Sequence, residues 1–264
     1  MGFKFKWIFS VVVVIVLLLN FSLVLSVEPF GAQVTERRSE RAPNDTAQSI
    51  FAQAGNVTEM DIIGFSITQS WQGYFGNVSG TITLGDLSDN VLYNWSAVNP
   101  SGEVYATNAT LVSWVNIQCF NFTATGTYAS DVAQRGATSL YGTNLSLLEN
   151  WTGIAVGDVD GVDETFTLLG SGHDIFYTNN LEFAGGECRN TRLFGDTGAG
   201  VDGEFEEVLL YDPDNQAVIF TSLIENSTVL GFDDGDHDFE LIVLENGHST
   251  DVAVTNYYFY LEIQ

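Results

Sequence analysis

The sequence predicts a mainly β fold on three observations. Short runs of residues alternate between apolar and polar with a period of two, as in strands that bury one face. Residues that favour turns, chiefly Gly, Asn, Asp and Pro, separate these runs. Only two stretches, 46–54 and 143–151, have a helical pattern. Many short strands joined by turns indicate a β-sandwich, immunoglobulin-like or jelly-roll-like, after a single N-terminal hydrophobic helix.

The clearest alternating run covers residues 91–97. It places Val91, Tyr93 and Trp95 on one face, which we expect to turn toward the core. Asn94 then lies on the opposite face, toward solvent. The other runs that predict strands are 79–84, 104–107, 111–125, 164–169, 205–211, 217–224, 239–244 and 256–263.

Two turn sequences predict hairpins between these strands. Residues 212–215 read Asp-Pro-Asp-Asn, in which Pro presets φ and Asn tolerates a positive φ. Residues 245–248 contain Asn-Gly, the pair that tight hairpin turns favour. Each turn is therefore expected to join two antiparallel neighbours.

The first 26 residues form a membrane-targeting segment. Lys4 and Lys6 give it a basic start, and no charged residue follows until Glu28. A spanning helix needs about 20 apolar residues and a cleaved signal peptide about 7–15, so the length favours a membrane anchor over a signal peptide. A prepilin-type helix is a third alternative. Residues 27–46 are polar and predict a stalk, and residues 47–264 form the β-rich ectodomain.

Acceptor triplets for N-glycosylation indicate that the ectodomain is exported. One lies within the hydrophobic segment at Asn20, and the chain composition alone predicts only about three in all. The ectodomain sequons are Asn44, Asn56, Asn77, Asn94, Asn108, Asn121, Asn144, Asn150 and Asn226. We therefore expect a cell-membrane glycoprotein that spans once with its ectodomain outside, or otherwise a secreted one.

The two cysteines agree with export. An even number of cysteines in an exported chain favours a disulfide between Cys119 and Cys188 over two free thiols. If Phe120 and Phe122 face the core, strand geometry places Cys119 on the outer face. The disulfide is then expected to clamp residues 185–189 onto the outside of a sheet.

The charge of the ectodomain is strongly negative. Three of the 34 acidic residues precede residue 44, which leaves 31 against three arginines, a formal charge of −28. Such a charge excludes nucleic acid as a partner and suits high salt or the recruitment of divalent cations. Most of these sequons lie before Gly153, whereas most of the acidic residues lie after it. This suggests two lobes, 47–126 and 153–264, as the alternative to one unit.

The densest acidic cluster is a candidate metal site. Asp158, Asp160, Asp163 and Glu164 lie in a Gly-containing segment, and short loops of this kind aim carboxylate oxygens at Ca²⁺. The segment resembles the calcium loops of FG-GAP repeats, except that Val162 stands where a third alternating ligand is expected. A solvated acidic turn is the alternative interpretation. No other cofactor is expected.

The sequence gives less support for a metal site or a catalytic site that uses histidine. Residues 233–238 form a second acidic loop that includes His237, and His173 and His248 also lie beside glycines. Their spacing does not match a zinc motif. Ser171, His173 and Asp174 are too close in sequence to converge as a catalytic triad, so we predict no catalytic residue and no enzyme.

Aromatic residues offer one binding alternative. The simplest interpretation is that the tryptophans are buried in the core: Trp71, Trp95, Trp114 and Trp151. Exposed on a sandwich face, such rings could stack on sugars. This makes a carbohydrate- or ligand-binding module, Ca²⁺-dependent in one version, the leading alternative function. A secreted hydrolase is the second alternative.

Two segments carry a family resemblance. Residues 71–80, Trp-Gln-Gly-Tyr-Phe-Gly-Asn-Val-Ser-Gly, and 173–180, His-Asp-Ile-Phe-Tyr-Thr-Asn-Asn, resemble stretches of uncharacterised archaeal surface proteins of the woesearchaeal type. The resemblance implies an archaeal envelope and no activity. We therefore expect a structural or adhesive envelope protein whose partners are the membrane, surface glycans or envelope proteins.

Overall fold

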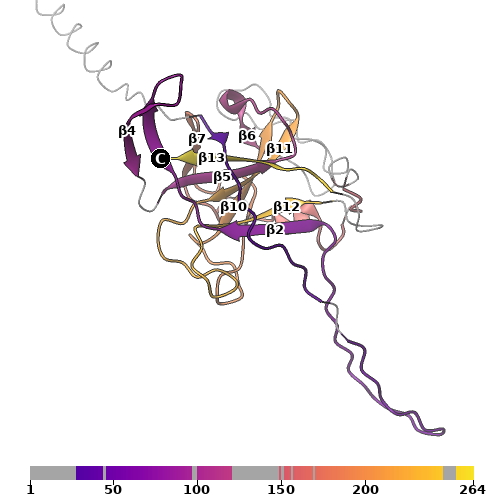
Figure 1. Cartoon of the computed structure of the whole chain (residues 1–264). Coiled ribbons are helices and arrows are strands. Elements are labelled where there is room, and N and C mark those ends of the chain that lie inside the picture. Colours follow the sequence, from indigo (N-terminus) through magenta and orange to yellow (C-terminus); the bar gives the residue numbers. More distant parts are fainter. Residues whose placement is uncertain are drawn as a thin grey trace, which may run out of the picture.

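The computed structural model describes residues 28–43, 46–96, 100–120, 149, 152–155, 157–168, 170–245 and 254–264 (Figure 1). The predicted hydrophobic helix and most of the predicted helix 143–151 lie outside these residues. Within the described part of the chain, no helix has the length and hydropathy that a membrane crossing requires.

The centre of the molecule is one antiparallel sheet, which confirms the prediction of a mainly β protein. Its strands, in spatial order, are β1 (Phe30–Gly31), β13 (Tyr258–Ile263), β5 (Gly102–Thr107), β11 (Ala217–Leu223), β10 (Glu206–Asp212) and β6 (Gln118–Cys119). A seventh strand, β9 (Asn190–Arg192), also pairs with β10. Strands from 47–126 (β5 and β6) and from 153–264 (β13, β11, β10 and β9) are therefore interleaved in this sheet.

The predicted turn at residues 212–215 joins β10 and β11, as expected. Asp212 caps it, because its Oδ1 accepts the N–H of Asp214 at 2.9 Å and its Oδ2 accepts the side-chain amide of Asn215 at 2.7 Å. Gln216 adopts a φ of 54°, which completes the reversal. The two strands then pair from Asp212↔Ala217 to Glu207↔Ser222.

A two-stranded ribbon covers one face of the central sheet. It consists of β2 (Trp71–Gly76) and β12 (Phe239–Leu244), which pair antiparallel. Leu241 and Val243 of the ribbon pack on Leu209 and Phe220 of the sheet in one buried cluster. The predicted hairpin turn at residues 245–248 lies, apart from Glu245, outside the described residues. The described strands before and after it do not pair with each other, because β12 pairs with β2 while β13 pairs with β5 and β1.

The opposite face of the central sheet is also covered. The short hairpin of β7 (Phe176–Thr178) and β8 (Leu181–Phe183) and the 3₁₀ turn η1 (Trp114–Asn116) pack against Val208, Leu210 and Ile219. The apolar runs of β10 and β11 are continuous because both of their faces are buried, so alternate residues serve two different clusters.

The predicted Cys119–Cys188 disulfide is present. Cys119 and Phe120 point to opposite faces of the sheet, as strand geometry requires, and belong to different buried clusters. The face expected to be outside is nevertheless the buried one, since Cys119 is 3% and Cys188 0% exposed. The bond therefore lies inside the layer beneath β7 and β8 rather than on the outside of the sheet.

Several local predictions are wrong. Residues 46–54 contain no helix, and the segment 164–169, predicted as a strand, begins in the short helix α3 (Val162–Thr165). The hairpin of β3 (Thr81–Gly85) and β4 (Val91–Ser96) has the expected alternation, but Tyr93 and Trp95 are 59% and 51% exposed. Val91 of the same face is exposed as well, so the apolar face of the β3–β4 hairpin is open to solvent and the expectation that it turns toward the core is wrong.

Candidate metal centre

The site is built around α3, where the acidic segment 157–164 meets the core. Val162 and Phe166 are fully buried, and the ring of Phe166 packs 6.1 Å from that of Trp71. Gly157 has a φ of 86°, which favours glycine, and turns the chain into the loop before the helix. The apolar anchors thereby hold α3 against the core while its acidic residues turn to the edge.

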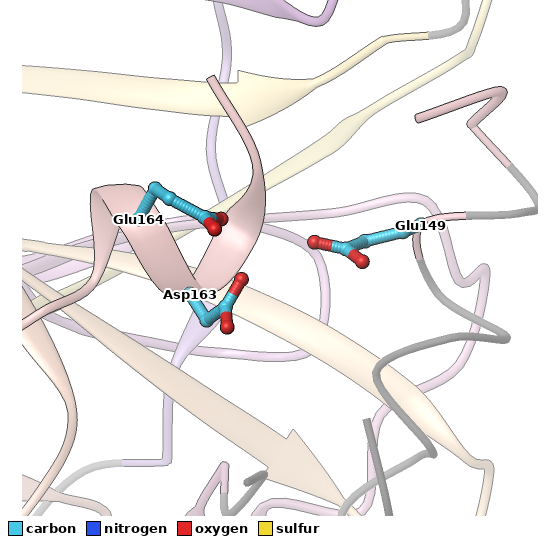
Figure 2. Close-up of side chains that lie close together, drawn as sticks. All are labelled: Glu149, Asp163 and Glu164. Carbon is cyan, nitrogen blue, oxygen red and sulfur yellow. The ribbon is translucent and has the colours of Figure 1, made fainter. Parts of the chain in front are cut away.

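Three carboxylates converge at this edge, which we call the carboxylate triad: Glu149, Asp163 and Glu164. One oxygen of each lies within 4.8 Å of one oxygen of both others. Figure 2 shows the side chain of Glu149 directed from its own segment toward the two side chains of α3. The backbone N–H of Val162 donates to Glu149 Oε1 at 3.2 Å and fixes this orientation.

Two oxygens of the triad have no hydrogen-bond partner among the described residues. They are Glu149 Oε2 and Asp163 Oδ1, and both atoms are buried. The Glu149 residue as a whole is 0% exposed. Burying a carboxylate oxygen without a partner costs several kcal/mol, so the arrangement is incomplete as a purely structural feature.

The electrostatics of the triad lead to the same conclusion. The hydrogen bond that the protonated Glu164 carboxyl donates to Asp163, together with burial, raises the pKa of Glu164 to about 7. Burial and the nearby charges of Asp163 and Asp158 raise the pKa of Glu149. The three groups repel one another as anions, and a bound cation or a shared proton relieves this repulsion.

The sequence-predicted ligands are divided between two roles. Asp163 and Glu164 belong to the triad. Asp160 instead accepts the hydroxyls of Thr68 and Ser70 through Oδ2 at 2.7 and 3.0 Å. Asp158 accepts the N–H of Ala155 at 2.8 Å. These two aspartates therefore shape the loop and attach it to the chain before β2.

Glu149 is the member of the triad that the sequence did not indicate. It is separated from Asp163 by 14 positions and lies in a segment predicted as helix, so no ligand spacing connects the two. One signal was available, because Glu149 is the only acidic residue between Asp131 and Asp158, within the apolar run 145–151. An isolated acid in such a run is a candidate for a buried, functional group.

The second acidic loop, residues 233–238, is used for local structure. Asp233 Oδ1 accepts the N–H of Gly235 at 3.0 Å and contacts His237 Nε2 at 2.7 Å. The hydrogen bond with His237 lowers the pKa of Asp233. Asp238 accepts the N–H of Val78 at 2.6 Å and ties the loop to the segment after β2.

His173 is a structural residue of the buried disulfide layer. Its Nε2 accepts the N–H of Cys188 at 3.0 Å, and its Nδ1 lies 2.7 Å from the carbonyl oxygen of Asp174. Both ring nitrogens are thus engaged, and burial lowers the pKa of His173. His248, which we considered with it, lies outside the described residues.

The predicted glycosylation sites and tryptophans can be placed in part. The described sequon asparagines are all exposed: Asn56, Asn77, Asn94, Asn108 and Asn226. Those at Asn44, Asn121, Asn144 and Asn150 lie outside the described residues, as does Trp151. Trp114 is buried and Trp71 partly buried in the core, as expected, whereas Trp95 is on the open hairpin.

A further acidic group that the sequence did not indicate lies inside the central sheet. Glu103 of β5 and Glu262 of β13 are direct cross-strand neighbours, 3% and 1% exposed. The hydroxyl of Tyr105 lies 3.0 Å from Glu262 Oε2 and 3.4 Å from Glu103 Oε2. Burial, together with the Glu262 carboxylate, raises the pKa of Glu103 well above its usual range, so a proton is held in this pair.

Comparisons with known proteins give no further guidance for this fold and site. No protein family, no curated protein and no solved structure matches the chain.

Proposed function

We propose that this chain is an N-glycosylated cell-surface protein with a structural or adhesive role in the envelope, displayed by its N-terminal hydrophobic segment. The observation that carries the proposal is the disulfide between Cys119 and Cys188, buried beneath β7 and β8. Structural disulfides form and persist in oxidising compartments, which supports a location outside the cytosol. The exposed sequon asparagines and the formal charge of −26 of the whole chain support the same location.

For the ectodomain we propose a β-sandwich. The supporting observation is the β2–β12 ribbon, whose apolar face packs on one face of the central sheet. Two packed β layers with a shared core are the basis of a sandwich. The disulfide and the β7–β8 hairpin stiffen the other face, which suits a domain that bears load or presents a surface.

The envelope setting has one more support. Residues 71–80 and 173–180 resemble stretches of archaeal surface proteins, and both belong to the folded domain, in β2 and around β7. The partners in this proposal are the membrane, through residues 1–26, and surface glycans or envelope proteins. The proposal assigns no catalytic step and no nucleic acid partner.

Protease shaving of intact cells tests the surface location. Residues 44–264 contain no lysine and three arginines but 31 acids, so a Glu-specific protease is the suitable reagent. Peptides from residues 47–264 are expected from intact cells of the native host, in amounts that lysis does not increase. Peptides released only after lysis would contradict the proposal. A deletion strain with unchanged adhesion and unchanged envelope integrity would contradict the structural or adhesive role.

Carbohydrate binding is a second candidate function, favoured by the open face of the β3–β4 hairpin. Ile82 and Leu84 of β3 lie opposite Trp95 and Tyr93 of β4, and the two aromatic rings are 4.9 Å apart. Such an exposed aromatic pair on a flat ribbon can stack on sugar rings.

A glycan array with two variants tests this second candidate. Trp95→Ala removes a ring from the apolar face, and Thr83→Ala alters the other face of the same hairpin. Binding that Trp95→Ala abolishes and Thr83→Ala preserves is the expected result. No binding by the wild-type protein, or equal loss in both variants, would remove this candidate.

A further inference from the structure

We propose that Glu149, Asp163 and Glu164 bind one Ca²⁺ ion, which joins the segment of Glu149 to α3 at the edge of the core. This inference is independent of the surface role proposed above, since the ligands and their geometry do not depend on where the protein is displayed.

The first argument is the state of Glu149. Its side chain is fully buried, is oriented by the N–H of Val162 and extends toward Asp163 and Glu164 (Figure 2). Its Oε2 has no hydrogen-bond donor among the described residues. Asp163 Oδ1 is likewise buried without a partner. One cation can satisfy two buried carboxylates that converge in this way, whereas a solvated acidic turn leaves its carboxylate oxygens in water.

The second argument is the size of the site. Three oxygens that lie within 4.8 Å of one another share a centre no more than about 2.8 Å from each, by the geometry of an equilateral triangle. Ca²⁺ binds oxygen at about 2.3–2.6 Å with flexible geometry, so small rotations of the side chains close the site. Mg²⁺ demands near-ideal octahedral geometry at about 2.0–2.1 Å, and Zn²⁺ prefers nitrogen and sulfur ligands. An all-carboxylate site of this width favours Ca²⁺.

The third argument is how the site is connected to the core. The loop that leads to α3 is fixed by Asp160, which accepts the Thr68 and Ser70 hydroxyls and, through its carbonyl oxygen, the indole N–H of Trp71 at 2.7 Å. Trp71 packs in turn against Phe166 at the end of α3. A cation held by the triad therefore closes a link between Glu149 and an element already anchored at both ends.

The number of protein ligands in the triad sets the expected affinity for Ca²⁺. Three protein ligands leave the remaining coordination positions to water, as in weak calcium sites of extracellular modules with dissociation constants on the order of 10⁻⁴–10⁻³ M. Binding favours the folded state, because the unfolded chain does not bring Glu149 and α3 together. Calcium is therefore expected to raise the unfolding temperature as well as to bind.

Calorimetric titration of the intact, disulfide-bonded protein with CaCl₂, at physiological salt, tests the proposal. The wild-type protein is expected to show one saturable site. Glu149→Gln and Asp163→Asn each remove one ligand charge and are expected to weaken it about tenfold or more. Asp89→Asn is the matched control: it removes one exposed acid from the turn between β3 and β4, where a φ of 62° also suits Asn.

Further readouts decide the outcome. Circular dichroism of each variant without calcium checks that it folds, and thermal unfolding with and without calcium checks the coupling. The absence of a saturable site, binding that survives both triad variants, or equal loss in Asp89→Asn would overturn the proposal, the last because it indicates general attraction to an acidic protein. Mg²⁺ binding as tight as Ca²⁺ binding would overturn the assignment to calcium.

Discussion

Breaking the Cys119–Cys188 disulfide is expected to lower the free energy of unfolding by about 4 kcal/mol. The bond closes a loop with a sequence separation of 69 residues, and in the chain-entropy relation a loop of this length restricts the unfolded chain by that amount. Because both cysteines are buried, a reductant reaches them only when the layer beneath β7 and β8 opens. The protein is therefore reduced in urea and refolded with the reductant present.

Urea unfolding of the oxidised and the reduced protein, followed by tryptophan fluorescence, measures the difference. The double variant Cys119→Ala/Cys188→Ala is the control, since its unfolding curve must not respond to the reductant. The variant also loses sulfur atoms from the core, and its difference from the reduced wild-type protein isolates that packing loss. A change on reduction of less than about 1 kcal/mol would refute the reasoning that the bond limits the unfolded chain.

Three further predictions concern the buried acids and the core. Burial raises the pKa of Glu225 from 4.5 to about 7 in the folded protein, so the unfolded chain releases this proton at a lower pH than the folded chain does. The free energy of unfolding is therefore expected to fall as the pH rises from 4.5 to about 7. Glu225→Gln should flatten that part of the urea-midpoint profile, and an unchanged slope would contradict it. Glu207 is fully buried, its pKa is raised well above 4.5 by burial, and it accepts one N–H from Ile242. Glu207→Gln keeps the acceptor and cannot ionise, so its urea midpoint should exceed that of the wild type at about pH 8 and approach it at about pH 4.5; equal differences at both would argue against a neutral Glu207. Phe166→Ala removes a fully buried ring beneath α3 and is expected to cost about 3–5 kcal/mol in urea unfolding, whereas a cost below about 1 kcal/mol would contradict the packing of α3 on the core.

The alternation of side chains in the sequence predicted the strands better than it predicted their surroundings. A period of two separates Cys119 from Phe120 and Tyr93 from Asn94, and both separations are present. It does not say which face another layer will cover. The face of Cys119 was expected outside and is buried, whereas the face of Tyr93 was expected inside and is open.

The candidate site was predictable only in its local part. The acidic segment 158–164 was recognised, because its four acids lie close together in sequence. Which of them point to a common centre depends on competing local donors, and the hydroxyls of Thr68 and Ser70 hold Asp160 elsewhere. Glu149 reaches the site only through the tertiary fold, so sequence spacing contains no record of it.

The order of the strands in the sheets could not be predicted from the sequence for a similar reason. Neighbouring strands in the chain were expected to pair as hairpins, and β10 with β11 does so across a turn of the right chemistry. β2 pairs with β12 across more than half of the chain, and β5 lies between β11 and β13. Such long-range pairings are selected by the complementarity of buried faces, which a single strand does not reveal.

Peptide mass mapping of the protein purified from its native host tests the central claim, that this is an exported surface domain, most directly. Non-reducing digestion is expected to yield a peptide pair linked through Cys119 and Cys188, and glycan mass on exposed sequon asparagines such as Asn77, Asn94 and Asn226. Free thiols at both cysteines, together with unmodified asparagines at every sequon, would contradict export and with it the proposed role in the envelope.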